Sequence, residues 1–313
     1  MRDPATIRLL PDGHRLHLND GPIDLIIEAN GERGAIRAAY EAAARRFVTI
    51  LDELCAELPL LRRRATPCSL QPRGPIARIM AGAVAPYCER QFVTPTAAVA
   101  GAVAEAMLDE MSRATELDRA YVNNGGDIAF HLSPGYCYTL GMIERPDLPR
   151  LIGSVEISAS SPVRGAATSG WRGRSFSLGI ADAVTVLGAT AAQADAAATI
   201  IANAVDLPGH PAVTRVAANE VAPDSDLGAI AVTRNVGSLA GHEIEKALKN
   251  GVKVAEELRA RKLIHSAALC LQSHVRVVAD RPVGARFCKD GFKEPRATAR
   301  GDHTVSGRSF YHA

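Results

Sequence analysis

A single charged side chain, Asp195, interrupts an otherwise uncharged run that extends over residues 183–205. The first part of the run is apolar and strand-like, and the second part is alanine-rich and predicts a helix from about Thr190. Gln193 follows Thr190 at the spacing of a capping box, which favours a helix start there. An ionised carboxylate on a helix without a polar face is unfavourable unless a cation, a donor network or a ligand compensates its charge. The fold therefore has to provide a partner for Asp195.

Thr199 lies one helical turn after Asp195, so the hydroxyl and the carboxylate share one helical face. Both groups are hard oxygen ligands of the kind that Mg²⁺ prefers, which makes the pair half of a candidate metal site. Backbone carbonyls, water or a phosphate of a ligand would have to supply the other oxygens. The alternative is structural: backbone amides or an arginine satisfy Asp195, and Thr199 bonds back to its own helix.

The composition of the 313-residue chain, with 47% hydrophobic and 22% charged residues, is typical of a soluble globular protein. A formal net charge of +2 gives no global attraction to nucleic acid or to an anionic membrane, and we expect neither as a partner. Six cysteines without metal-ligand spacing favour reduced thiols over a disulfide framework. The N-terminus lacks the apolar block of a signal peptide and no run reaches the length of a membrane span, so we expect a cytoplasmic protein.

Alternating apolar runs mixed with a few long periodic segments predict an α+β fold with mostly antiparallel sheets packed against the helices. Helices are expected at about 33–58, 75–88, 95–111, 190–205 and 239–261, and strands at 6–10, 14–18, 22–28, 119–123, 127–132, 136–143, 151–158, 181–188, 229–235 and 264–279. We expect residues 1–283 to form one domain, which could divide into lobes at 1–115 and 116–283. The basic segment 284–313 predicts a flexible tail.

The Asn-Asn-Gly-Gly-Asp segment at 123–127 directly follows a predicted strand. Two successive glycines, Gly125 and Gly126, leave room for backbone N–H groups to face a phosphate or the polar edge of a ring. Asn124 and Asp127 complete this candidate ligand-binding segment, because the Asp127 carboxylate can accept a hydrogen bond from a ligand. Asn-Gly is also the strongest short hairpin signal, so a turn that joins two strands explains the same residues without a ligand.

The small-residue segment 165–171 predicts a loop. Thr168, Ser169 and Gly170 could use hydroxyls and amides to bind a phosphate or a flat ring, with Trp171 as a stacking wall. An ordinary turn is the alternative. The dinucleotide-binding Gly-x-Gly-x-x-Gly, the phosphate-binding Gly-x-x-x-x-Gly-Lys, His-Glu-x-x-His and Gly-x-Ser-x-Gly motifs are all absent from the sequence, which argues against Rossmann dehydrogenases, P-loop enzymes, zincins and α/β-hydrolases.

The order of these pieces resembles the ApbE-like superfamily, whose best-known members are FAD:protein FMN transferases. Residues 122–127 are similar to that family's Asn-x-Gly-Gly-Asp segment, residues 167–170 to its Thr-Ser-Gly turn, and residues 184–199 to its Val-Thr-Val…Ala-Asp-Ala-x-x-Thr strand and helix. The resemblance covers about residues 33–205 and implies an α+β fold. It also implies Mg²⁺ at Asp195 and Thr199, and FAD as substrate or ligand.

Two departures separate this chain from the transferases. Their His-x-x-x-Asp-Pro-x-Thr-Gly loop is replaced by a shorter stretch at 173–182 that has neither the histidine nor the Asp-Pro pair. Ala100 stands where their Ser-x-x-x-Lys-Gly motif has its lysine. The chain therefore resembles a shortened branch of the superfamily.

The resemblance implies a Mg²⁺-dependent enzyme that handles flavin nucleotides, with an acceptor protein as a partner if FMN is transferred. Without the histidine, the base that activates the acceptor hydroxyl is open between Asp182 and Asp127. Arg174 could clamp a phosphate or a carboxylate, a task that suits its planar fork. Two alternatives remain: a protein that binds a flavin or nucleotide without turnover, and a metal-dependent enzyme acting on a small anionic metabolite.

Overall fold

The computed structural model describes residues 4–67, 71–145, 150–279 and 286–287 of the chain. The helices are α1 (Arg33–Ala56), α2 (Leu58–Leu61), α3 (Pro75–Val84), α4 (Val99–Ala114), α5 (Ala191–Ala204), α6 (Ala218–Val221) and α7 (Gly241–Ala260), with 3₁₀ turns η1 (Ala85–Tyr87) and η2 (Pro95–Ala98). The strands are β1 (Thr6–Leu9), β2 (Arg15–Asp20), β3 (Ile23–Asn30), β4 (Arg119–Asn124), β5 (Asp127–Leu132), β6 (Cys137–Ile143), β7 (Leu151–Ser158), β8 (Gly165–Ser169), β9 (Ala183–Gly188), β10 (Val213–Ala217), β11 (Ala231–Val236), β12 (Ser266–Leu271), β13 (His274–Val278) and β14 (Arg286–Phe287).

Nine strands of the described chain form one sheet in the order β1-β2-β3-β4-β5-β8-β9-β12-β13. Every neighbouring pair in this sheet is antiparallel. The α+β prediction with mostly antiparallel sheets is therefore confirmed. Because β3 pairs with β4, the segments before and after residue 115 contribute to the same sheet.

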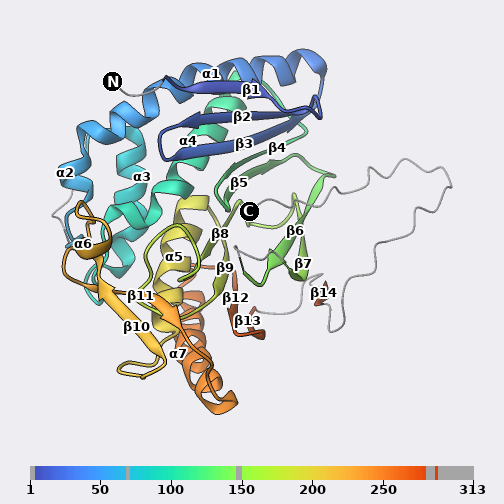
Figure 1. Ribbon diagram of the computed structural model, residues 1–313. Coiled ribbons are helices and arrows are strands. Elements are labelled where there is room, and N and C mark those ends of the chain that lie inside the picture. The colour runs from blue at the N-terminus through green and yellow to red at the C-terminus, as the bar shows by residue number, and fades with distance from the viewer. Residues whose placement is uncertain (1–3, 68–70, 146–149, 280–285, 288–313) are drawn as a thin grey trace.

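The long helices α1, α4, α5 and α7 cover one face of this sheet (Figure 1). Helix α5 lies between α4 and α7 and rests on β8 and β9, which explains why it lacks a polar face. Its contact with α4 is especially close: a Cβ placed on Gly101 would overlap the backbone of Ala191. Among the described residues, no helix combines the length and the apolar character that crossing a membrane requires.

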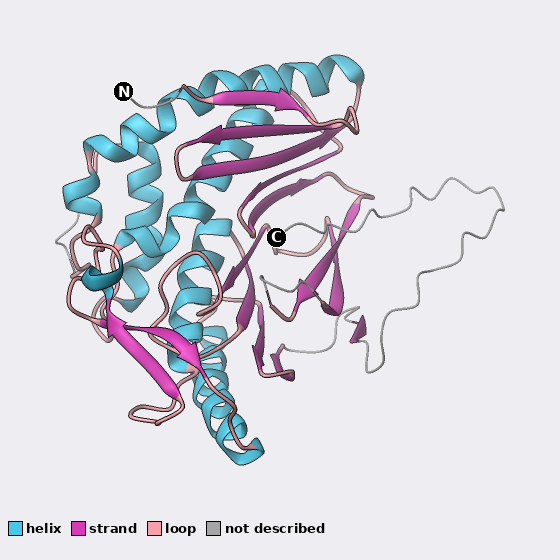
Figure 2. Cartoon of the chain, in the orientation of Figure 1, coloured by secondary structure: helices cyan, strands magenta, loops and turns pink. Residues whose placement is uncertain are grey.

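The opposite face of the sheet carries the β6–β7 hairpin and a smaller apolar core. The rings of Tyr121, Phe130 and Tyr138 meet there edge to face, with centroids 6.1 Å apart in both pairs with Tyr138. A separate two-stranded ribbon, β10–β11, extends from the body of the molecule (Figure 2). The strands in the middle of the main sheet, such as β9 and β12, are therefore buried over nearly their whole length, whereas the edge strand β1 is exposed.

The structure differs from the sequence prediction at β8, which the sequence indicated as a loop. This strand lies between β5 and β9, and a Cβ on its first residue, Gly165, would overlap the backbone at Ala191. The small residues that resembled a turn are therefore required by the close approach of α5. Strand β10 was also not predicted. The predicted tail at 284–313 lies outside the described residues except for β14, which pairs with β7.

Candidate functional site

The predicted Asn-Asn-Gly-Gly-Asp segment forms the hairpin turn between β4 and β5. Asn124 and Asp127 are register partners, and the turn residues Gly125 and Gly126 have φ angles of 64° and 109°. Positive φ at both central positions is the geometry of a type I′ turn, which glycine adopts without strain. The side-chain oxygen of Asn123 accepts a 2.8 Å hydrogen bond from the Gly126 N–H. The hairpin interpretation is thus confirmed, while ligand binding by this segment stays a prediction.

Two side chains of this turn are directed toward the helix layer. Asn124, which is 5% exposed, donates from Nδ2 to the Ala100 carbonyl of α4 at 3.2 Å. Asp127, which is 9% exposed, accepts from the Thr168 N–H of β8 at 3.2 Å. The turn therefore connects the ends of two strands to the first turn of α4.

Asp195 lies opposite this turn, in α5, and its partner in the structure is the N-terminus of α4. Its Oδ2 accepts a 3.0 Å hydrogen bond from the Gly101 N–H, and the Ala100 N–H also contributes. Helix α4 begins after Ala98, whose side chain offers no cap. Because the first N–H groups of a helix lack partners within it, a carboxylate from a neighbouring helix is a favourable cap. This contact matches the structural alternative for Asp195, in which backbone amides satisfy the carboxylate.

Asp127 and Asp195 form an electrostatically coupled pair. Burial raises the pKa of Asp195 to about 7, against the opposing effect of the Gly101 and Ala100 amides. Burial also raises the pKa of Asp127 well above its usual range, and the charge of Asp195 raises it further. The Thr168 amide and the guanidinium of Arg174 act in the opposite direction. Two carboxyl groups with raised pKa values in one place are typical of functional sites.

Thr199 occupies the next turn of α5 and is partly buried. Its hydroxyl has no hydrogen-bond partner among the described residues. Within the same residues, no group of three or more His, Cys, Asp or Glu side chains gathers in a way that could hold a metal ion. A cation bound at Asp195 and Thr199 would therefore depend on other oxygens for the rest of its coordination. The metal assignment of these two residues stays a prediction.

Arg174 reaches the site from the loop between β8 and β9. Its guanidinium lies directly against Gly125, where a Cβ would overlap Nη2 and approach Cζ to 3.0 Å. The side chain is exposed, and it influences the pKa of Asp127. The structure thus brings Arg174 together with the Gly-Gly turn and with Asp127, all of which the sequence singled out.

The Thr-Ser-Gly segment contributes mainly backbone to this region. Thr168 uses its N–H on Asp127, and its hydroxyl shares a 2.9 Å hydrogen bond with Thr185 of β9. Ser169 ends strand β8, and Gly170 packs so closely on the next segment that a Cβ would lie 2.5 Å from the Asp182 carbonyl. Ligand binding by this segment also stays a prediction.

Asp182 has a different environment from Asp127. Its Oδ1 accepts from Arg172 Nε at 2.7 Å and from Trp171 Nε1 at 3.2 Å, and its Oδ2 accepts from the Gln272 N–H at 2.6 Å. The side chain is buried. Both oxygens are therefore engaged in holding the start of the β8–β9 loop against the β12–β13 turn.

The model of the family described as AbpE bacteria matches residues 7–277. The chain belongs to this family. It is also similar to a UPF0280 protein of Methanopyrus kandleri, with 33% identity over 181 residues that cover 58% of this chain and 69% of that protein. A UPF0280 protein of Methanothrix thermoacetophila is 34% identical over 173 residues, or 50% of this chain and 64% of that protein.

Two solved structures are similar to this AbpE-family chain at low sequence identity. A mutant of the flavin transferase ApbE from Vibrio cholerae has a TM-score of 0.47 and 11% identity, covering 85% of this chain and 96% of that chain. The ApbE protein from Thermotoga maritima has a TM-score of 0.45 and 11% identity, with 87% and 96% coverage. The ApbE-like resemblance predicted from the sequence motifs is confirmed by the family match.

The N-terminus of α4 is the part of the candidate site to which no role was assigned from the sequence. Ala100 and Gly101 contribute through backbone atoms, so their side chains carry no chemical signal. Two signals were available: the resemblance of 96–101 to the Ser-x-x-x-Lys-Gly motif, with Ala100 at the lysine position, and the small residues that allow the close approach of α4 and α5.

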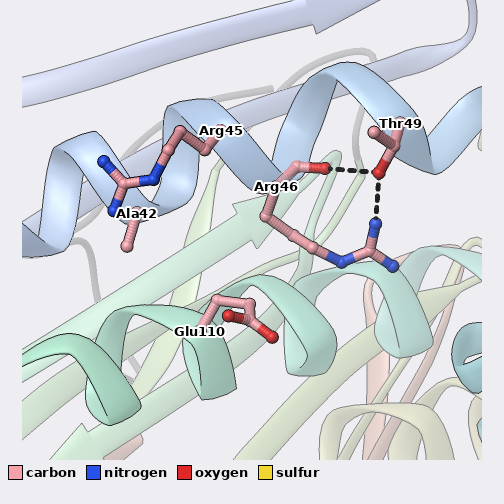
Figure 3. Close-up of a pocket in the computed structure, with 5 residues that line it drawn as sticks. All are labelled: Ala42, Arg45, Arg46, Thr49 and Glu110. Atoms are coloured by element: carbon pink, nitrogen blue, oxygen red, sulfur yellow. Dashed lines mark hydrogen bonds between the residues drawn. The ribbon is translucent and has the colours of Figure 1, made fainter.

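A hollow of about 260 Å³ lies elsewhere on the molecule, between α1 and α4 (Figure 3). Ala42, Arg45, Arg46 and Thr49 of α1 line it together with Glu110 of α4. Glu110 stands in the last turns of α4, whereas Asp195 contacts the first turn. Arg46 is already paired with Glu53 through two hydrogen bonds of 2.6 and 2.7 Å. This hollow is therefore distinct from the coupled carboxyl pair.

Proposed function

We propose that this protein is a Mg²⁺-dependent enzyme that handles flavin nucleotides, with a reaction of the FMN-transferase type. The observation that carries the proposal is the coupled pair Asp127 and Asp195 at the first turn of α4, beside a Gly-Gly turn. The family match and the shared Asn-x-Gly-Gly-Asp, Thr-Ser-Gly and Ala-Asp-Ala-x-x-Thr segments support the substrate class.

The residues present fit a magnesium ion. The Asp195 carboxylate and the Thr199 hydroxyl are hard oxygen ligands one turn apart on α5. The raised pKa values of Asp195 and Asp127 indicate that positive charge is in short supply around the pair. Asp195 and Thr199 would hold the ion, and when bound it would neutralise a pyrophosphate and stabilise a departing phosphate.

In this proposal Asp127 is the general base and Asp182 is not, because both oxygens of Asp182 already accept hydrogen bonds from the loop and the β12–β13 turn. The raised pKa of Asp127 lies closer to the pH at which the protein works, and a general base is most effective when its pKa is near that pH. The proton of the acceptor hydroxyl moves to the Asp127 carboxylate, the hydroxyl oxygen bonds to the phosphorus of the FMN half, and the bond from that phosphorus to the bridging oxygen breaks. AMP leaves with the bridging oxygen.

Titration of the purified protein with FAD, with and without Mg²⁺, tests the proposal. We expect FAD binding that requires Mg²⁺, followed by release of AMP and by FMN that is free or bonded to an added hydroxyl acceptor. The Asp195→Ala variant is the matched negative control. Tight FAD binding without AMP would overturn the reaction in favour of a non-catalytic flavin-binding protein. Mg²⁺ binding without any affinity for flavin would favour an enzyme acting on a small anionic metabolite.

A further inference from the structure

We propose that Arg174, seated on the side-chain-free face of Gly125, is the residue that recognises the phosphate or pyrophosphate of the ligand at this site. The inference rests on the proposed function and assigns the side chain that binds the negatively charged phosphates of the nucleotide. The guanidinium of Arg174 occupies the space in which a Cβ of residue 125 would stand, with Nη2 overlapping that position and Cζ 3.0 Å from it.

Arg174 differs from the neighbouring Arg172 in how its charge is used. Arg172 is committed to Asp182 at 2.7 Å and stacks over the Trp171 ring, with Cζ 4.2 Å from the ring centroid. Arg174 is exposed and forms no ion pair at contact distance with any described carboxylate. Its planar fork is therefore available to an incoming anion, in the bidentate geometry that suits phosphate.

The base of the β8–β9 loop fixes where Arg174 lies. The Trp171 N–H donates to the Ala181 carbonyl at 3.0 Å, which closes the loop across its two ends. Asp182 then holds the Trp171 and Arg172 side chains from the same end. Arg174 follows this anchored segment by two residues. Asp182 is thus a positioning residue that acts through the loop.

The charges of the site require such a cation. A phosphate that approached Asp127 and Asp195 without compensation would be repelled by two carboxyl groups. Arg174 is the guanidinium that already offsets Asp127 from the exposed side of the turn. A bound anion at this position would meet the positive fork of Arg174. A ligand with adjacent phosphates matches this arrangement better than a neutral ring does.

Calorimetric titration of the full chain in Mg²⁺ with FAD, FMN, riboflavin and inorganic pyrophosphate tests the inference. For Arg174→Ala we expect binding of FAD, FMN and pyrophosphate to weaken about ten- to a hundredfold, the range expected when a charged hydrogen bond is lost, with riboflavin unchanged. Arg174→Lys keeps the charge but loses the fork, and we expect it to recover only part of the affinity.

Gly125→Ala provides an independent variant, because it leaves the arginine in the chain but displaces the end of its side chain from the turn. We expect it to weaken the binding of phosphate-bearing probes, by less than Arg174→Ala does, since the displaced guanidinium keeps its charge. Gly135→Ala is its matched control: Gly135 also has positive φ, at 91°, but a Cβ there meets nothing within 4 Å, and it lies outside the site. Circular dichroism and melting temperature verify that each variant is folded.

The outcomes separate this inference from the proposed function. If FAD binds wild type and Arg174→Ala equally well, Arg174 does not recognise the phosphate, although the flavin proposal stands. If pyrophosphate binds in an Arg174-dependent manner but no flavin binds, the inference stands and the flavin proposal fails. If neither FAD nor pyrophosphate binds the folded wild-type protein, both are overturned.

Discussion

The carboxyl groups of Asp127 and Asp195, which come from a strand turn and a helix, share one site in which the charge of Asp195 raises the pKa of Asp127. Asp195 also caps the first turn of α4 through the Gly101 N–H. One carboxylate therefore joins three elements: helix α5 that carries it, helix α4 that it caps, and the β4–β5 turn whose aspartate it faces. A group with this position has a structural role even without a ligand, and variants that keep the cap but lose the charge distinguish that role from metal binding.

Replacement of Asp195 tests the metal assignment. We expect Asp195→Ala to abolish Mg²⁺-dependent binding of FAD, measured by calorimetry, because the carboxylate is the charged member of the proposed ligand pair. Asp195→Asn retains an oxygen that can accept from Gly101 and therefore keeps most of the cap, but it removes the charge. We expect it to lose Mg²⁺ dependence while remaining as well folded as wild type. Undiminished Mg²⁺-dependent binding in Asp195→Asn would exclude Asp195 as a ligand.

Thr199→Val is the companion variant, because it exchanges the hydroxyl for a methyl group of similar size. A neutral ligand contributes less than a carboxylate, so we expect a weaker Mg²⁺ response with an unchanged melting temperature in the metal-free protein. A Mg²⁺ titration identical to that of wild type would remove Thr199 from the site.

The metal-free protein should lose stability as the pH rises. Burial raises the pKa of Asp195 from 3.8, its ordinary value and the one expected in the unfolded chain, to about 7 in the folded state. The folded state therefore holds the proton more tightly, so this contribution to stability is complete below about pH 4 and is lost as the pH rises through about 7. We expect the unfolding free energy of wild type to decrease between pH 5 and pH 8 by on the order of 2 kcal/mol more than that of Asp195→Asn. The melting temperature of wild type should fall correspondingly more steeply over this range.

Melting temperatures measured with and without Mg²⁺ complement the pH profiles. At pH 8, where Asp195 is ionised, we expect Mg²⁺ to raise the melting temperature of wild type and to leave Asp195→Asn unchanged. Parallel pH profiles for the two proteins would show that Asp195 does not titrate in this range.

Asp182 is expected to matter for the loop more than for chemistry. Asp182→Asn removes the charge that holds Arg172 inside a buried set of hydrogen bonds, so we expect a loss of about 2 kcal/mol in denaturant unfolding. Glu257→Gln is the matched control, since its ion pair with Arg90 is exposed and should contribute less than about 1 kcal/mol. If Asp182→Asn were as stable as wild type yet inactive, the base role of Asp182 would return.

The sequence predicted the parts of the site that depend on side-chain chemistry. The structure brings together Asp127, Asp195, Gly125 and Arg174, which residue type and spacing had singled out, while the metal-binding role of Asp195 and Thr199 stays a prediction. Strand β8 was missed because glycine has a low strand propensity, and Gly165 is needed here for the close contact with the neighbouring helix α5. That backbone amides could satisfy Asp195 was one of the sequence alternatives, but the sequence did not indicate which amides, because Gly101 participates through its backbone and lies far away in the chain.

The close contact between α4 and α5 at Gly101 should make the protein sensitive to any side chain at that position. A Cβ on Gly101 would lie 2.6 Å from the Ala191 carbonyl carbon and 2.8 Å from the Ala192 nitrogen, and backbone on both sides cannot yield cheaply. We expect Gly101→Ala to destabilise the protein by about 2–3 kcal/mol through overpacking, although alanine is the better helix former. Gly82→Ala in α3 has the same helical setting with nothing within 4 Å, and we expect it to stabilise by up to about 1 kcal/mol. Chemical denaturation of the two variants side by side decides the matter, because equal effects would mean that the helices do not touch at Gly101 and that Asp195 is not held against the N-terminus of α4.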